Sequence, residues 1–175
     1  KRVKRSMGEE LAINGGKPVR ETYLPYGRQA IDDEDIEAVI KVLKSDYLTT
    51  GPMIRVFERD MAEITGAKYA VAFSNGTAAL HAACFAAGIT EGDEVITTPM
   101  TFAATSNSVL YQRGKPVFAD IDSQTYNIDP KSIKQLVTER TKAIVPVHFT
   151  GQPADMDAIM QIADEHELVV IEDAA

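Results

Sequence analysis

The 175-residue sequence contains no tryptophan, a single cysteine and only three histidines. One cysteine cannot form an internal disulfide, and Cys84 lies in the alanine-rich run from Ala78 to Ala87, so we interpret it as a small buried hydrophobic residue rather than a nucleophile. His81, His148 and His166 are not spaced as the ligands of one metal ion. The sequence therefore predicts neither a disulfide framework nor a metal site.

The chain is also poor in basic residues and in long apolar runs. It carries 18 Lys and Arg against 26 Asp and Glu, a net charge of -8, which argues against nucleic acid or an anionic membrane as the main partner. The basic cluster within residues 1–5 is interpreted as a solvated tail. No run approaches the roughly 18 apolar residues of a membrane span, and no signal-peptide pattern is present, so we expect a cytoplasmic protein.

Two common phosphate-binding motifs are missing as well. The sequence has no GxGxxG and no GxxxxGK[ST], so a dinucleotide fold and a P-loop have little support. Any attraction for phosphate has to come from a different local arrangement.

What the sequence does contain is a series of short, continuous apolar runs separated by helical patterns. Such runs are typical of strands that are buried on both faces of a parallel sheet. The predicted strands are Tyr69 to Phe73, Glu94 to Thr98, Pro116 to Ala119, Ala143 to Val147, and Leu168 to Ile171. Their alternation with helices predicts an α/β fold with helices on both faces of the sheet.

The helical patterns have recognisable starts and apolar stripes. Asp129-Pro130 combines a side-chain cap with a first-turn proline, and Asp155 precedes a stripe that begins at Met156. Two amphipathic helices are predicted upstream, along Ile36 to Leu43 and Ile54 to Ile64. The segment from Gly8 to Tyr26 has no periodicity and is expected to form an extended arm.

The turn from the first predicted strand into the next helix reads Ser74-Asn75-Gly76-Thr77. Glycine permits close approach of a ligand, and the free N–H groups and dipole of a helix start attract an anion such as phosphate. The alternative is that Ser74, Asn75 and Thr77 merely cap the helix, and spacing alone does not decide between the two.

Glu172-Asp173 follows the last predicted strand. At least one of these carboxylates should stand at the carboxyl edge of the sheet, where open α/β sheets bind ligands, and a shielded carboxylate needs a partner. A protonated ring nitrogen would serve, whereas capping of the next segment or pairing with an arginine are the alternatives.

Two further residues follow strand ends. Phe102 would stack on a flat heterocycle or belong to the core. His148 would touch a ligand or be a hydrogen-bonded structural residue, which is the commoner role for a lone histidine. Asp120 and Asp122 are interpreted as turn residues.

These segments occur in the order seen in one protein family. The chain resembles the pyridoxal-phosphate-dependent sugar aminotransferases of the DegT/DnrJ/EryC1/StrS family from about Leu11 to Ala175. The segments that carry the resemblance are Gly51-Pro52, Ser74 to Leu80, Gly92 to Ile96, Thr101-Phe102, Ala119 to Asp122, Gly151 to Asp157 and Glu172 to Ala175.

The resemblance implies a fold-type I, aspartate aminotransferase-like large domain. Residues 1–25 would form an amino-terminal arm, and residues 26–175 the amino-terminal part of the domain that binds pyridoxal 5'-phosphate. It further implies that Asn75, Gly76 and Thr77 hold the cofactor phosphate, that Phe102 stacks on the ring and that Asp173, as the catalytic residue, pairs with the ring nitrogen.

The resemblance also implies a substrate and an assembly. Tyr26 and the segment Asp46, Tyr47, Leu48 and Thr49 would border a sugar nucleotide, and the expected assembly is a homodimer in which they would lie at the interface. Segments such as Leu24 to Arg28 are most similar to enzymes that aminate a UDP-4-keto-6-deoxy amino sugar on the pseudaminic acid route, with glutamate as the expected donor.

The family's Schiff-base lysine occurs in a motif that this sequence does not contain. A chain with this sequence alone is therefore expected to be inactive as an aminotransferase. Two alternatives stay open: a sugar dehydratase with histidine at the lysine position, and a cofactor-binding relative without catalysis.

Overall fold

The computed structural model describes residues 11–25 and 27–175. The chain divides between Met53 and Ile54 into two compact units, and each unit is described by itself. Tyr26, one of the predicted substrate-binding residues, lies outside the described residues.

The first unit contains a 3-10 turn, η1 (Ala12–Asn14), and the helix α1 (Asp33–Leu43). Asp32 caps α1 and accepts from the N–H groups of Glu34 and Asp35, while Asp35 returns a bond to the N–H of Asp32. This reciprocal cap explains why the helix begins where the sequence predicts it, while its apolar stripe stays exposed within the unit. In the predicted arm, the described residues show only η1.

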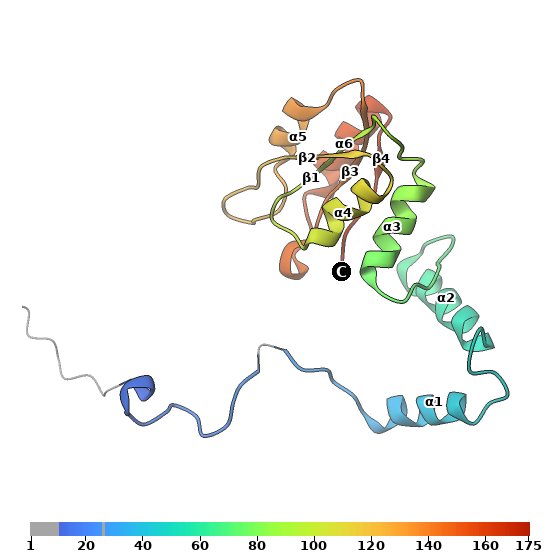
Figure 1. The fold of residues 1–175 in the computed structure, drawn as a ribbon, viewed down its shortest axis with the longest axis vertical. Helices are drawn as coiled ribbons and strands as arrows, with labels where there is room; N and C mark the ends of the chain where they lie inside the picture. Colours follow the sequence, from blue (N-terminus) through green and yellow to red (C-terminus); the bar gives the residue numbers. More distant parts are fainter. Residues whose placement is uncertain (1–10, 26) are drawn as a thin grey trace, which may run out of the picture. The chain divides into compact units, whose positions relative to one another are not determined.

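The second unit is built on a four-stranded parallel sheet (Figure 1). The strands are β1 (Glu94–Thr97), β2 (Lys115–Phe118), β3 (Thr141–Val145) and β4 (Val169–Val170), in the order β2-β1-β3-β4. The helices are α2 (Pro52–Thr65), α3 (Gly76–Ala86), α4 (Ala103–Tyr111), α5 (Pro130–Leu136) and α6 (Met156–His166), with a 3-10 turn η2 (Phe149–Gly151) after β3.

The two faces of the sheet are covered by different helices (Figure 1). Val95 of β1 packs with α3 and α4, whereas the next residue, Ile96, packs with α5 and α6. Because side chains of a strand alternate between faces, adjacent apolar residues fill two separate cores. The continuous apolar runs of the sequence thus arise from burial on both sides, as predicted.

One predicted strand is wrong. Tyr69 to Phe73 forms no strand, and its backbone pairs with no strand among the described residues. The exposed side chains of Tyr69, Val71 and Phe73 alternate with the partly buried Ala70 and Ala72, so the sequence has the right periodicity. A strand, however, also needs a neighbour to receive its backbone hydrogen bonds, and here the N–H of Ala72 donates to the side chain of Glu58 instead.

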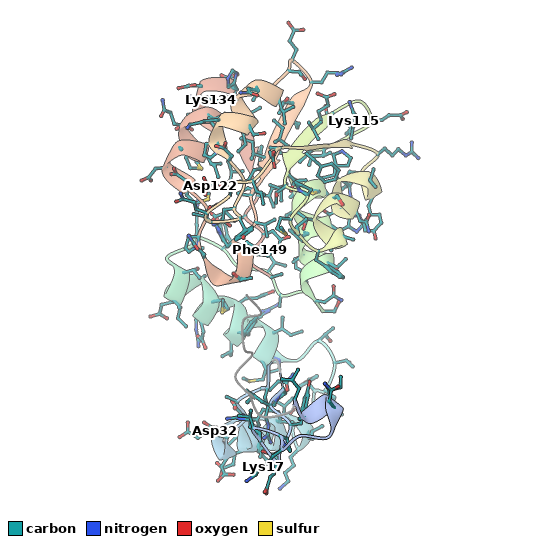
Figure 2. All side chains as sticks on the ribbon, turned by 90° about the vertical axis from the view of Figure 1, so that its left-hand side faces the viewer. Lys17, Asp32, Lys115, Asp122, Lys134 and Phe149 are labelled. Carbon is teal, nitrogen blue, oxygen red and sulfur yellow. The ribbon has the colours of Figure 1, made fainter. Side chains whose placement is uncertain are left out.

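A buried carboxylate, that of Glu94, lies at the amino-terminal edge of the sheet and bonds to several side chains. Glu94 accepts from Arg140 at 2.8 Å, Lys115 at 3.1 Å and the Thr138 hydroxyl at 2.8 Å. These bonds, with that from Thr138 the largest contribution, lower the pKa of Glu94. Figure 2 shows Lys115 at the opposite end of this unit from Phe149, which follows the carboxyl end of β3.

Among the described residues, no helix has both the length and the apolar character that a bilayer crossing requires. The same part of the chain holds no cluster of three or more His, Cys, Asp or Glu side chains suited to a metal ion.

Candidate functional site

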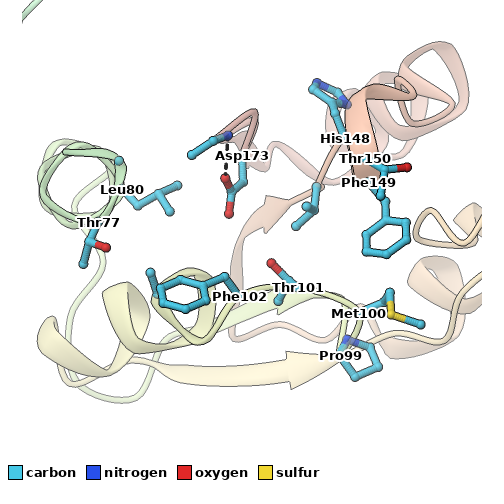
Figure 3. A pocket seen from close by; sticks show the side chains of 14 residues that line it. Thr77, Leu80, Pro99, Met100, Thr101, Phe102, His148, Phe149, Thr150 and Asp173 are labelled. Carbon is cyan, nitrogen blue, oxygen red and sulfur yellow. Dashed lines mark hydrogen bonds between the residues drawn. The ribbon is translucent and has the colours of Figure 1, made fainter. Parts of the chain in front are cut away.

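The carboxyl ends of the strands and the start of α3 surround a pocket of about 480 Å³ (Figure 3). Gly76 and Thr77 line it from α3, Phe102 from the start of α4, His148 from the segment after β3, and Asp173 from the segment after β4. Residues nearly a hundred positions apart therefore meet at one edge, as expected for ligand sites in open α/β sheets.

Asp173 is the buried acid of this pocket, with only 5% of its surface exposed. Its backbone N–H donates to the carbonyl of Pro146 at 2.9 Å, and its carbonyl accepts from the N–H of His148 at 3.0 Å. Val147 and Asp173 thus form a parallel bridge that continues the β3–β4 pairing. This backbone pairing fixes the position of the Asp173 backbone, and therefore of its Cα atom, at the edge of the pocket.

The carboxylate of Asp173 is held by two neutral donors. The Thr105 hydroxyl donates to Oδ2 at 2.6 Å, and the N–H of Ala175 donates to Oδ1 at 3.2 Å. No lysine, arginine or histidine forms an ion pair with it among the described residues. A buried carboxylate without a cation is costly, so this pocket is suited to a ligand that brings a positive charge. Pairing with an arginine, one alternative for this residue, is not seen in the described part of the chain.

Glu172, the neighbouring acid, serves a different purpose. Its Oε2 lies 2.8 Å from Nε2 of His148, while Nδ1 of His148 accepts the N–H of Ala154 at 3.1 Å. Since Nδ1 must be unprotonated to accept, the ring proton sits on Nε2 and is donated to Glu172. This agrees with the interpretation of His148 as a hydrogen-bonded structural residue, although its ring also borders the pocket.

The start of α3 forms one wall of the pocket. The side chain of Asn75 caps the helix by accepting the N–H of Ala78 at 2.9 Å, so the capping interpretation is confirmed for this residue. Gly76 and Thr77 occupy the first two helical positions, where backbone N–H groups have no acceptor within the helix. Both residues line the pocket, whereas Asn75 does not. The residue that caps the helix is therefore not one of the two that line the pocket.

Gly76 also sits where a side chain would not fit. A Cβ at this position would lie 2.8 Å from the Cβ of Ala175, closer than carbon atoms pack. The glycine therefore allows the segment after Asp173 to approach α3. The two predicted contacts for a ligand, the helix start and the buried acid, are in this way brought to the same pocket.

Phe102 precedes α4 and is 78% exposed while lining the pocket. The alternative that it belongs to the core is therefore wrong. A ring with a free face at the pocket wall can stack on a flat ligand.

The predicted substrate-binding residues that the structure describes belong to the first unit. Asp46, Tyr47, Leu48 and Thr49 follow α1 in the first unit, and all four are exposed there. Nothing in the sequence singled out Thr105, whose hydroxyl contacts Asp173. The only signal is a pair of threonines four residues apart, one just before the start of the helix and one in its first turn.

A second hollow, of about 740 Å³, lies between the Asp122 to Lys134 segment and the start of α6. Several of its polar groups already bond within the protein. The Asp122 carboxylate accepts the N–H groups of Gln124 and Thr125, which confirms its interpretation as a turn residue and lowers its pKa. Asn127 donates to the carbonyls of Gln152 and Pro153. The smaller pocket, with its free helix N–H groups and cation-free acid, is the better candidate.

Comparison with known proteins shows which family the chain is similar to. The model of the DegT/DnrJ/EryC1/StrS aminotransferase family matches residues 29–175. Among curated proteins, the chain is 51% identical over 156 residues to the spore coat polysaccharide biosynthesis protein SpsC of Bacillus subtilis, covering 89% of this chain and 40% of SpsC. The chain thus spans about two fifths of that relative.

Solved structures give the same result. DesI, studied in the presence of its TDP-sugar product, is 41% identical with a TM-score of 0.84, over 94% of this chain and 42% of DesI. NtdA of Bacillus subtilis with bound cofactor PMP is 39% identical with a TM-score of 0.76, over 82% and 34%. PseC of Helicobacter pylori, an aminotransferase of pseudaminic acid biosynthesis, is 34% identical with a TM-score of 0.81, over 86% and 41%.

Proposed function

The chain belongs to the DegT/DnrJ/EryC1/StrS aminotransferase family, and from this premise we propose that it forms the cofactor-binding part of a pyridoxal-phosphate-dependent sugar aminotransferase. The observation that carries the proposal is the buried, cation-free carboxylate of Asp173 in a pocket that also contains a free helix start. Such a pocket suits a ligand with a protonated nitrogen at one end and a phosphate at the other.

The residues present fit that cofactor. Asp173 would accept a hydrogen bond from the protonated ring nitrogen and keep the ring in its charged form. The N–H groups of Gly76 and Thr77 would bind the phosphate, with the Thr77 hydroxyl as a further donor. Phe102 would cover one ring face. When bound, pyridoxal phosphate supplies the electron sink for moving a proton at the carbon that carries the amino group.

In the proposed reaction, an amino acid such as glutamate would lose its amino group and leave as the corresponding keto acid. The keto carbon of a nucleotide-linked sugar would receive the amino group and lose its oxygen as water, with the chemistry that the bound cofactor would supply. The protein orients the ring, keeps water away from one face and holds the proton at the ring nitrogen. Two findings support a nucleotide sugar: DesI is known with its TDP-sugar product, and PseC acts in pseudaminic acid biosynthesis. The finer proposal is a UDP-4-keto-6-deoxy amino sugar.

Substrate contacts outside the pocket are part of the same proposal. Tyr26 and Asp46 to Thr49 would border the sugar nucleotide, and in a homodimer they would be able to do so for the neighbouring subunit. The four described residues of this set are exposed within their own unit and thus available for such contacts.

The decisive experiment replaces Asp173 by alanine in the full-length protein. We expect the rate of amino transfer to fall by about a hundredfold or more, because a preorganised charge next to the cofactor ring is lost. The start of α3 is unchanged in this variant, so inorganic phosphate should still compete with the cofactor phosphate for it. Asp164→Ala, which removes an exposed carboxylate of α6, is the matched control and should keep wild-type activity.

Each possible result has a definite meaning. Activity near wild type in Asp173→Ala would contradict the assigned role. A wild-type protein that binds the cofactor but releases a deoxygenated sugar without an amino group would be a dehydratase. No amino transfer to any keto sugar would point to a non-catalytic relative.

A further inference from the structure

A chain of two hydroxyl groups runs from the pocket wall to the buried acid. Thr101 lines the pocket, and its Oγ1 lies 2.6 Å from Oγ1 of Thr105. The Thr105 hydroxyl in turn lies 2.6 Å from Oδ2 of Asp173. Thr105 is fully buried, so no bulk water competes for these bonds.

The protons of this chain have a defined direction. An ionised carboxylate only accepts hydrogen bonds, so the single hydroxyl proton of Thr105 must point to Asp173. It is then not available for the carbonyl of Phe102, which lies at the longer distance of 3.1 Å. The hydroxyl of Thr101 therefore donates to Thr105 and turns only lone pairs toward the pocket. Both hydroxyl protons are aligned toward the carboxylate, which strengthens each bond.

From this arrangement we propose that Thr105, supported by Thr101, is a positioning residue that fixes the Asp173 carboxylate for the ring nitrogen of the cofactor. The inference rests on the proposed function. Thr105 holds Oδ2 and the N–H of Ala175 holds Oδ1, so the carboxylate plane is set before the ligand arrives. Without the Thr105 donor this plane can rotate, and the ligand has to order it on binding.

The size of the effect follows from that ordering. Immobilising one side chain on binding reduces affinity by about twofold to tenfold, and the loss should appear only with a ligand that uses the carboxylate. A purely structural role of Thr105 would instead weaken every ligand of the pocket alike. The two roles are therefore separable by a ligand that lacks the ring nitrogen.

The experiment uses the full-length protein and two probes, pyridoxal phosphate and its 1-deaza analogue, in which a CH group replaces the ring nitrogen. Dissociation constants are measured for wild type, Thr105→Val, which keeps the shape but loses the hydroxyl, and Thr105→Ser, which keeps the hydroxyl. Thr97→Val is the control, because Thr97 is an equally buried threonine whose hydroxyl donates to the carbonyl of Val145 at 2.8 Å.

We expect Thr105→Val to bind pyridoxal phosphate about twofold to tenfold more weakly and the deaza analogue with unchanged affinity. Thr105→Ser should bind both probes with wild-type affinity, and Thr97→Val should not change the preference between the two probes. Unchanged binding of pyridoxal phosphate by Thr105→Val, or equal weakening of both probes, would overturn the proposal.

Wild type itself tests the premise. Equal affinity of wild type for both probes would mean that Asp173 does not pair with the ring nitrogen, which overturns both the positioning role and this part of the proposed function. If Thr105→Val does not fold, Thr101→Val at the half-buried end of the chain takes its place. It should show a smaller loss of the same selectivity, and equal weakening of both probes would again refute the inference.

Discussion

The contact between Gly76 and Ala175 allows a sharp test of how the two ends of the pocket are joined. In Gly76→Ala the new Cβ would lie 2.8 Å from the Cβ of Ala175, about 0.6 Å inside the 3.4 Å at which ordinary van der Waals contact begins. Gly76 does not have the positive φ that would strain an alanine. The cost therefore comes from overpacking and should be about 1–3 kcal/mol.

The two segments affected, the start of α3 and the segment after Asp173, are those that would bind the cofactor. Relief of the clash moves the segment after Asp173 away from the start of α3. We expect Gly76→Ala to lower the melting temperature of the full-length protein and to weaken binding of pyridoxal phosphate. Ala175→Gly alone removes one exposed methyl group and should change stability by about 0.5 kcal/mol or less.

The double variant Gly76→Ala/Ala175→Gly moves the methyl group from one segment to the other. Because the clash requires both Cβ atoms, the double variant should recover most of the stability and the affinity, giving a coupling energy of about 1–3 kcal/mol. Wild-type behaviour of Gly76→Ala, or a double variant no better than the single one, would refute the reasoning that this close approach sets the pocket.

Two further predictions concern the sheet. The hydrogen bond from Thr138, followed by that from Lys115 and the charge of Arg140, keeps the pKa of Glu94 below its ordinary 4.5, so the stabilisation is complete above that pH and is lost as pH falls through the folded-state pKa. Thermal unfolding should accordingly show wild type more stable than Glu94→Gln at pH 7 and the difference shrinking on acidification; a constant difference would contradict this. Ile144→Ala should cost about 2–5 kcal/mol in urea unfolding, because this fully buried side chain packs with α5 and α6, and a loss below about 1 kcal/mol would show that the core does not depend on it.

The sequence predicted those parts of the fold whose cause is local or periodic. The stripes on α1, α2 and α6, the caps at Asp129 and Asp155, and four of the five strands all rest on patterns within a few neighbouring residues. The strand at Tyr69 to Phe73 failed because a strand also depends on a partner elsewhere in the chain, which periodicity does not reveal.

The site shows the same division. Position in the sheet pointed to the helix start and to the Glu172-Asp173 pair, but only the structure shows that Asp173 faces the pocket while Glu172 bonds to His148. The choice depends on strand register, a property of the paired backbone. Thr105 was missed because its role arises from a contact across 68 positions of sequence.

The alternation of Glu172 and Asp173 has a consequence for how such a sequence can change. Inserting a single residue in the short stretch from Leu168 to Ile171 would move Glu172 into the place of Asp173 and Ile171 into the place of Glu172. The longer glutamate would then enter the pocket and the histidine would lose its partner. Surface loops commonly tolerate insertions, whereas an insertion along this tip would misplace both acids.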